Sequence, residues 1–305
     1  MRWKGVLPPA PIFDCANGTY ESTVVMSSLE ATNAKIEAGA SLKDAEWMAA
    51  AQPSPDALLA GDVRNYALFL DCDGTLLDIA QTPNEVRVPD GLVELLVRVS
   101  KGLGGALAVL TGRRLAEIDV LLTPARLIGA GVHGAEIRTA AGGAIARVAT
   151  ALPDMLVEQV VRRCQALPGI IAEPKGPGLA VHYRLAPHLK DALEAELRGL
   201  LTQYSDGLVL CPGRKLFEII PAGHSKGTAL ETFCALPEFA GRRPIMIGDD
   251  MGDIPAFAAA HRLGGAGLRV AGEHFGYEET ELQNPKRVIA WLSRLAERLD
   301  AADAD

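Results

Sequence analysis

The chain has 305 residues, 49% of them hydrophobic, and a formal net charge of −8 at pH 7. This length is typical of one or two domains, and the apolar fraction is sufficient for a sizeable core. The acidic balance argues against a nucleic-acid-binding protein, whose surface is usually basic, but it leaves an anionic small substrate open because local fields can oppose the net charge.

Residues 1–61 are expected to form an N-terminal extension that is partly disordered or helical. They mix Ala, Ser, Pro and Gly with scattered charge, and a weak helical pattern occupies residues 28–51. Met26 stands directly before the sequence SSLEATNAK and is an alternative start of the natural chain. Mass spectrometry of the N-terminus would decide between the two starts.

From Ala67 onwards, short apolar runs alternate with helix-like stretches. Buried strands are predicted for residues 67–70 and 105–110 and for the sequences RLIGAGVHG and RRPIMIGDD. Helices are predicted for the stretches that begin at Pro89 and Thr111. Continuous apolar runs separated by helices are typical of parallel strands covered on both faces. The predicted fold class is therefore α/β, with a Rossmann-like parallel-sheet core.

The pattern changes between residues 134 and 222. Strand pairs are predicted for the sequences GAEIRTAAGGAIARVA, GIIAEPKGPGLAVHYRL and GLVLCPGRKLFEIIP, and helices for PDMLVEQVVRRCQAL and HLKDALEAELRGLLTQY. These elements indicate a smaller α+β domain, inserted because the core pattern resumes after Gly223. The predicted organisation is a core of residues 62–133 and 223–298, an inserted domain of residues 134–222, and a tail of residues 299–305.

Two aspartates follow the first predicted strand, in the sequence ALFLDCDGTLLD. Asp71 and Asp73 alternate on an extended segment, so their carboxylates face the same side. Like charges in one place resist ionising together unless a cation or a shared proton relieves them. An aspartate can attack phosphorus while a second carboxylate protonates the leaving group. The alternative interpretation is an acidic turn after a strand.

Two further motifs carry groups that suit a phosphate. In LTGRR, Thr111 and Arg113 lie at a predicted helix start, where N–H groups can hold phosphate oxygens, although Thr111 alone is also a common helix cap. In HSKG, Lys226 could neutralise a phosphoryl group or be a solvated lysine in the first turn of a helix.

The last motif, MIGDDMGDIPAF, places Asp249, Asp250 and Asp253 after a buried strand. Hard oxygen ligands at this density suit Mg²⁺, while the alternative is acidic residues favoured by a helix N-terminus. In parallel sheets, ligands bind at the carboxyl ends of the strands, where His133 is also expected. Together these motifs supply the groups for Mg²⁺-assisted phosphoryl transfer.

The sequences DCDGTL, LTGR, SKG and GDDMGD, in this order, resemble the four motifs of the haloacid dehalogenase (HAD) superfamily, and the insertion resembles its C2-type caps. The stretches GVHGAE, EPKGPGLAVHYR and GRKLFEIIPAGHSKG narrow the resemblance to the trehalose-6-phosphate phosphatase family. The resemblance covers about residues 62–298.

This resemblance implies a role for each matching residue. Asp71 would form an aspartyl-phosphate, Asp73 would act as acid and then base, and Thr111 and Lys226 would hold the phosphoryl oxygens. The implied Mg²⁺ ligands and their supports are Asp71, Asp73, Asp249, Asp250 and Asp253. The implied substrate-binding residues are Arg113, His133, Lys175, His182, Arg184, Lys215 and Glu218.

The chain departs from the family's usual sequence in the last motif. The family commonly has Thr-Asp-Glu after the Asp-Asp pair, and this chain has Gly252, Asp253 and Ile254 in the sequence MGDIPAF. It is therefore open whether Asp250 or Asp253 supports the metal.

The resemblance implies a Mg²⁺-dependent phosphatase that converts trehalose 6-phosphate to trehalose and phosphate. One alternative is a phosphatase for another phosphosugar, such as sucrose phosphate or mannosylglycerate phosphate. Less favoured alternatives are a phosphomutase and an inactive sugar-phosphate-binding module, although a pure binder needs no nucleophile.

The expected partners are limited to a small phosphosugar. The five cysteines are scattered and form no CxxC pair, which argues against a disulfide framework or a zinc site and favours a cytoplasmic location. No apolar run approaches the roughly 18 residues that span a bilayer. We expect no nucleic-acid or membrane partner, and a monomer or small homo-oligomer.

Overall fold

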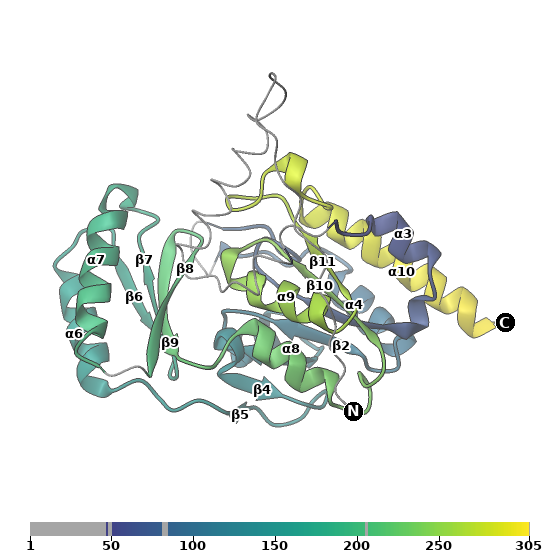
Figure 1. Ribbon diagram of the computed structural model, residues 1–305, viewed down its shortest axis with the longest axis horizontal. Helices are drawn as coiled ribbons and strands as arrows, with labels where there is room; N and C mark the ends of the chain where they lie inside the picture. Colours follow the sequence, from purple (N-terminus) through teal and green to yellow (C-terminus); the bar gives the residue numbers. More distant parts are fainter. Residues whose placement is uncertain (1–46, 48–50, 81–84, 205–206, 305) are drawn as a thin grey trace, which may run out of the picture.

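The computed structural model describes residues 47, 51–80, 85–204 and 207–304. Most of the extension predicted for residues 1–61, and almost all of the weak helix at 28–51, lie outside these residues. Within them, the chain forms two β-sheets with separate hydrophobic cores (Figure 1). No helix in this part of the chain is long and apolar enough to cross a membrane.

The larger sheet, as far as the described residues go, has seven strands in the order β11-β10-β1-β2-β3-β4-β5. Its strands are β1 (Tyr66–Leu70), β2 (Leu107–Leu110), β3 (Ile128–Gly131), β4 (Glu136–Arg138), β5 (Ala146–Arg147), β10 (Arg243–Gly248) and β11 (Ala266–Arg269). The five strands from β11 to β3 run parallel and are almost entirely buried, which explains their continuous apolar runs. The predicted α/β class with a parallel-sheet core is confirmed.

Helices pack around this sheet, α8 against α9 and α4 against α10 (Figure 1). The helices of this part are α3 (Pro55–Ala60), α4 (Leu92–Gly102), α5 (Leu115–Leu121), α8 (Lys226–Cys234), α9 (Ile254–Arg262) and α10 (Pro285–Ala304). The helix predicted from Pro89 is α4, which begins after Gly91 in a left-handed conformation and buries Leu92, Leu96 and Val99. Its apolar spacing of three and four residues is the helical period.

A second unit lies beside the larger sheet, and we call it the inserted unit (residues 154–221). Its strands β6 (Ile171–Pro174), β7 (Leu179–His182), β8 (Leu208–Gly213) and β9 (Leu216–Pro221) form an antiparallel sheet in the order β6-β7-β9-β8. Its helices α6 (Asp154–Gln165) and α7 (Lys190–Leu201) cover the face of this sheet that is turned away from the larger sheet (Figure 1). These helices and strands form where the sequence predicts them.

One predicted strand pair belongs to a different sheet than expected. The hairpin in the sequence GAEIRTAAGGAIARVA forms as β4 and β5, but it extends the larger sheet and does not join the inserted unit, as a boundary at residue 134 implied. The reason is the short turn of residues 132–135, which reverses the chain directly beside β3 and pairs Gly131 with Glu136.

Trp47 anchors the chain segment that precedes β1. Its indole is buried and stacks on Phe257 at 4.5 Å between ring centroids, and the guanidinium of Arg269 lies 5.8 Å from the indole centroid. The side-chain oxygen of Gln52 accepts a hydrogen bond of 3.2 Å from the backbone N–H of Gly267. Because β11 is the edge strand of the sheet, this segment covers an edge whose free N–H groups would otherwise invite pairing with another chain.

We predict that Trp47→Ala lowers the free energy of unfolding by about 3–5 kcal/mol, because it removes a buried aromatic side chain and leaves a cavity against Phe257. Trp47→Phe retains the stacked ring and should cost less. Urea denaturation of the three proteins measures the difference. Equal stability of the Trp47→Ala variant and the unsubstituted protein would show that this segment does not hold the edge of the sheet.

Candidate active site

The candidate site lies where three neighbouring strands end. The sheet order β10-β1-β2 places Asp249, Asp71 and Thr111 directly beyond the ends of adjacent parallel strands. The backbone N–H of Asp71 donates to the carbonyl of Ile247, so the pairing of β1 and β10 continues up to the first acid. Side chains that are distant in the sequence therefore meet at one edge, as expected for the carboxyl ends of parallel strands.

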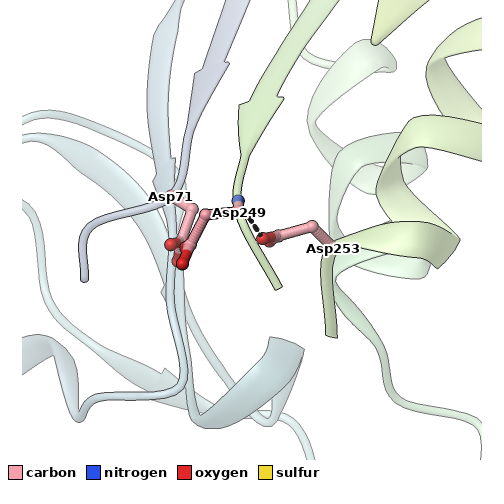
Figure 2. A group of neighbouring side chains, drawn as sticks. All are labelled: Asp71, Asp249 and Asp253. Atoms are coloured by element: carbon pink, nitrogen blue, oxygen red, sulfur yellow. Dashed lines mark hydrogen bonds between the residues drawn. The ribbon is translucent and has the colours of Figure 1, made fainter. Parts of the chain in front are cut away.

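Three buried carboxylates converge at this edge. Asp71, Asp249 and Asp253 each offer an oxygen, and these oxygens lie within 4.8 Å of one another. Figure 2 shows the side chains of Asp71 and Asp249 side by side, with Asp253 facing them from the other side. A purely carboxylate donor set of this kind suits a hard cation such as Mg²⁺.

Gly74 allows this close packing. It adopts a left-handed backbone with φ +87°, and a Cβ atom there would lie 2.1 Å from Oδ2 of Asp249. Any other residue would push the loop after β1 away from Asp249.

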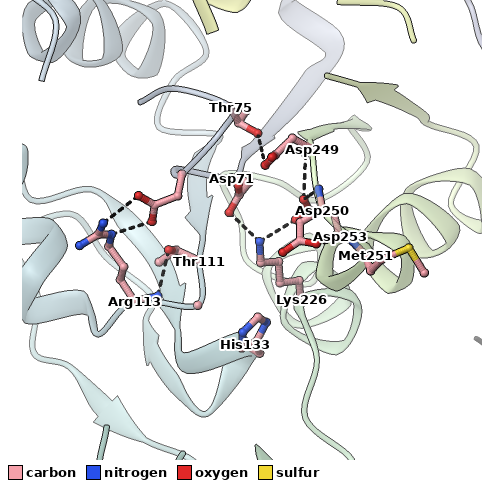
Figure 3. A network of polar contacts seen from close by, with 12 residues as sticks. Asp71, Thr75, Thr111, Arg113, His133, Lys226, Asp249, Asp250, Met251 and Asp253 are labelled. Carbon is pink, nitrogen blue, oxygen red and sulfur yellow. Dashed lines mark hydrogen bonds and ion pairs between the residues drawn. The ribbon is translucent and has the colours of Figure 1, made fainter. Parts of the chain in front are cut away.

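Lys226 joins two of the acids. It is the first residue of α8, and its buried Nζ donates to Oδ1 of Asp71 and to Oδ1 of Asp253, both at 2.6 Å (Figure 3). The other oxygen of Asp253 accepts the backbone N–H groups of Asp249 and Asp250 at 3.0 Å each. Since both Asp253 oxygens are engaged, this side chain orients Lys226 and the loop after β10.

The buried charges are not balanced. Burial raises the pKa of Asp71 to about 7; Lys226 opposes the rise and the Asp253 carboxylate adds to it. Burial and the neighbouring Asp71 also raise the pKa of Asp249 well above its usual value. The pKa of Lys226 is raised despite its burial, because Asp253 and Asp71 stabilise its charge. Two cations, the Lys226 ammonium and the Arg214 guanidinium 3.3 Å from Asp249, face three carboxylates, so negative charge remains that a divalent cation would neutralise.

Arg113 holds the second aspartate of the first motif. Its Nε and Nη2 donate to the two carboxylate oxygens of Asp73 at 2.6 and 2.8 Å, and its backbone N–H donates to Oγ1 of Thr111 at 3.1 Å (Figure 3). Two parallel hydrogen bonds of this kind fix both the orientation of the Asp73 carboxylate and its distance from the guanidinium. Arg113, which the resemblance assigns to substrate binding, thus holds the expected acid–base residue in this structure.

A cavity of about 380 Å³ opens over these residues, between the edge of the larger sheet and the inserted unit. Most of the residues predicted for the site line it: Asp71, Asp73, Thr111, Arg113, His133, Lys175, His182, Arg184, Glu218, Lys226, Asp249 and Asp250. Asp253 lies behind the wall, bonded to Lys226. The sequence motifs and the residues of the inserted unit therefore face one space.

Glu218 on β9 connects the inserted unit with the core. One of its oxygens accepts from Lys175 Nζ at 3.0 Å and the other contacts Nε2 of His133. Lys175 also donates to the carbonyl oxygen of Gly112 at 3.0 Å. Although burial opposes it, the charges of His133 and Lys175 hold the pKa of Glu218 well below its usual range. Glu218 is therefore an anionic acceptor at neutral pH.

Two predicted residues of β7 and its end take part in local pairs. Nε2 of His182 lies 2.8 Å from a carboxylate oxygen of Glu173 on β6. Arg184 hydrogen bonds the carbonyl oxygens of Ala80 in the core and, at 3.4 Å, of Arg214. Both side chains still line the cavity, so the pairs hold them in place at its wall.

Lys215 is placed differently from the prediction. Its Nζ lies 2.9 Å from Oε1 of Glu273, and its side chain is 42% exposed and is not among the described residues that line the cavity. Arg214 lines the cavity instead, with Nη1 3.3 Å from Oδ2 of Asp249. Arg214 lies in the turn directly before β9, on which Leu216 and Glu218 alternate toward the cavity, so strand alternation alone does not distinguish it from Lys215.

Strand alternation from the predicted Lys175 indicates Glu173, a residue that was not predicted for the site. Ile171, Glu173 and Lys175 alternate along β6 and its end, and all three line the cavity. Glu117 on α5 also lines it, and burial raises its pKa, to which the charge of Glu173 adds. No strand pattern points to Glu117, because it lies on a helix.

Comparisons with known proteins identify the family to which this chain belongs. A family model described as trehalose-phosphatase matches residues 69–288. A probable trehalose-phosphate phosphatase of Sinorhizobium fredii is 43% identical over 212 residues, which are 70% of this chain and 80% of that protein. A trehalose-6-phosphate phosphatase of Escherichia coli is 37% identical over 235 residues, 77% of this chain and 88% of that protein.

The fold also matches a solved structure. The C-terminal domain of trehalose-6-phosphate phosphatase from C. albicans aligns with a TM-score of 0.68, covering 81% of this chain and 99% of that one at 19% sequence identity. At this identity the likeness concerns the fold, which supports the parallel-sheet core and its neighbouring unit as one shared architecture.

We predict that saturating Mg²⁺ raises the melting temperature by about 5 °C, since a ligand at a hundred times its Kd adds about 2.7 kcal/mol to stability. Asp249→Asn should abolish the shift and should leave the metal-free protein at least as stable, because it removes one of three crowded carboxylates. Differential scanning fluorimetry measures both effects.

The control for this experiment is Glu278→Gln, which changes an exposed carboxylate outside the cluster and should retain the full Mg²⁺ shift. A shift in Asp249→Asn as large as in the unsubstituted protein would place the cation elsewhere.

Proposed function

We propose that this chain, which belongs to the trehalose-phosphatase family of phosphoric monoester hydrolases, is a Mg²⁺-dependent enzyme that hydrolyses trehalose 6-phosphate to trehalose and phosphate. The observation that carries the proposal is the contact of Asp71 with Lys226 beside Asp249, on the floor of a cavity that charged side chains of both units line. A cavity of about 380 Å³ lies within the usual range of small-molecule sites.

Asp71 is the proposed nucleophile. One carboxylate oxygen attacks the phosphorus, the new O–P bond forms, and the bond from phosphorus to the sugar oxygen breaks. Lys226 holds the carboxylate in a fixed orientation, since it is itself fixed by Asp253 and by the start of α8. The product of this step is an aspartyl-phosphate and the free sugar hydroxyl.

Asp73 is the proposed proton carrier. In the first step its protonated carboxyl gives a proton to the departing sugar oxygen, and in the second step its carboxylate takes a proton from the water that attacks the phosphorus. The second step breaks the bond between Asp71 and phosphorus, releases phosphate and restores both aspartates. Arg113 supplies a defined resting position for the ionised Asp73 between these steps.

The transferred phosphoryl group needs positive charge and hydrogen-bond donors around its oxygens. Lys226, the hydroxyl of Thr111 and the guanidinium of Arg214 all face this end of the cavity. The side chains of Asp71 and Asp249, with the main-chain carbonyl of Asp73 that the resemblance implies, would hold Mg²⁺, which neutralises charge on the phosphoryl group when bound. Asp253 would support them from behind the wall through Lys226 and the loop after β10.

The inserted unit would recognise the sugar. Glu218 is an anionic acceptor for sugar hydroxyls, and Lys175, His182 and Arg184 offer donors from the same face. Because Lys175 and Glu218 also contact Gly112 and His133 of the core, the sugar-binding residues are positioned only when the inserted unit lies against the core. This arrangement would exclude bulk water from the aspartyl-phosphate, as in other enzymes with lids.

A substrate panel tests the proposed activity. We expect phosphate release from trehalose 6-phosphate with Mg²⁺, a kcat/KM at least about tenfold above those for sucrose phosphate, mannosylglycerate phosphate and glucose 6-phosphate, and no turnover after chelation. A higher kcat/KM for another phosphosugar would reassign the substrate. Isomerisation without phosphate release would show a phosphomutase, and binding without turnover would show a regulatory module.

We predict that Asp71→Asn retains the fold and loses at least about a thousandfold in kcat, because the amide cannot form the acyl-phosphate. Circular dichroism checks the fold and phosphate release checks the rate. The matched control is Asp78→Asn, an exposed acid of the same segment that does not take part in the site. Residual turnover within a factor of about ten of the control would mean that another group attacks the phosphorus.

A further inference from the structure

The turn between β8 and β9 joins the inserted unit to a core loop that no sequence motif singled out. Arg214 and Lys215 form this turn, between Gly213 and Leu216. Lys215 Nζ lies 2.9 Å from Oε1 of Glu273, and Arg214 Nε lies 3.6 Å from Oε2 of the same carboxylate. One acid of the core thus faces two cations of the inserted unit.

The backbone of this turn is held in an unusual conformation. Lys215 has φ +59°, a left-handed conformation that non-glycine residues rarely adopt and that costs about 1 kcal/mol or more. Its carbonyl oxygen accepts the N–H of Tyr183 at 2.9 Å, and the carbonyl oxygen of Arg214 accepts Arg184 Nη2 at 3.4 Å. The turn therefore brings both side chains to Glu273, and of the two only Arg214 also lines the cavity.

The loop that carries Glu273 is also tied to the catalytic edge. His274 Nδ1 lies 2.8 Å from Oδ1 of Asp250, the residue after Asp249. A Cβ atom on Gly272 would lie 3.3 Å from Arg214 Nη1 and 3.6 Å from Asp249 Oδ2, so this loop passes directly beside both side chains. A displacement of Glu273 would therefore be felt at the phosphate end of the cavity.

We propose that Glu273 is a positioning residue whose carboxylate holds the β8–β9 turn against the core, directs Arg214 toward the phosphoryl group and favours the arrangement in which the inserted unit closes the cavity. The catalytic part of this inference rests on the proposed phosphatase function. A single half-exposed ion pair contributes little to overall stability, but it can shift an equilibrium between open and closed arrangements that differ little in free energy.

Charge reversal tests the contact. Glu273→Lys should raise the KM for trehalose 6-phosphate about three- to tenfold, with a smaller change in kcat, because the repelled turn withdraws Arg214 from the cavity. Lys215→Glu should act in the same direction. The double variant Glu273→Lys/Lys215→Glu restores the opposite charges at positions 273 and 215 but leaves a cation beside Arg214, so it should recover part of the loss, a rescue that a general loss of stability would not produce.

Small-angle X-ray scattering supplies a measurement that does not depend on activity. Each single variant should show a larger radius of gyration than the unsubstituted protein, and the double variant should return toward it. Glu278→Lys is the matched control, since it adds the same charge at an exposed position close in sequence and should change neither KM nor size.

The two readouts separate the two proposals. If the unsubstituted protein releases no phosphate from trehalose 6-phosphate, the proposed function fails, and the scattering still decides whether Glu273 holds the closed arrangement. An unchanged radius of gyration in Glu273→Lys, or a double variant that is as impaired as the single ones, would overturn the positioning role.

Discussion

The site depends on the shared position of Lys226 between Asp71 and Asp253. Burying three carboxylates together is costly, and the ammonium group of Lys226 with the guanidinium of Arg214 offsets only part of this cost. The contact joins the end of β1 to the start of α8 and to the loop after β10, so the site exists only when the parallel sheet is assembled. The negative charge that remains at Asp71 and Asp249 is what would let this edge hold a cation and, in the proposed function, supply the attacking carboxylate.

The other half of the chemistry comes from the inserted unit. Glu218 and Lys175 reach His133 and the carbonyl of Gly112, so the polar groups that would recognise a sugar are themselves bonded to the core. The same contacts hold the inserted unit over the cavity. Under the proposed function, sugar recognition and the exclusion of water would therefore depend on the same contacts.

Much of this could be predicted from the sequence, because parallel strands end at one edge. Apolar runs that end in polar residues predict that Asp71, Thr111 and Asp249 lie together, and they do follow adjacent strands of the sheet. The hairpin of β4 and β5 was assigned to the wrong sheet. Alternation and a Gly-Gly turn predict a strand pair, but they contain no information about which sheet edge the pair extends.

Turns and loops limited the prediction of the site. The family resemblance implied Lys215 as a substrate contact, whereas its neighbour in the β8–β9 turn, Arg214, is the residue that lines the cavity. The left-handed backbone of Lys215 sends its side chain out to Glu273, and no periodic pattern encodes that direction. Glu273 lies in an irregular loop and was not predicted for the same reason. The polar groups that gather at the strand ends can be predicted from residue spacing. The contacts that orient these groups depend on the backbone angles of the turns and loops.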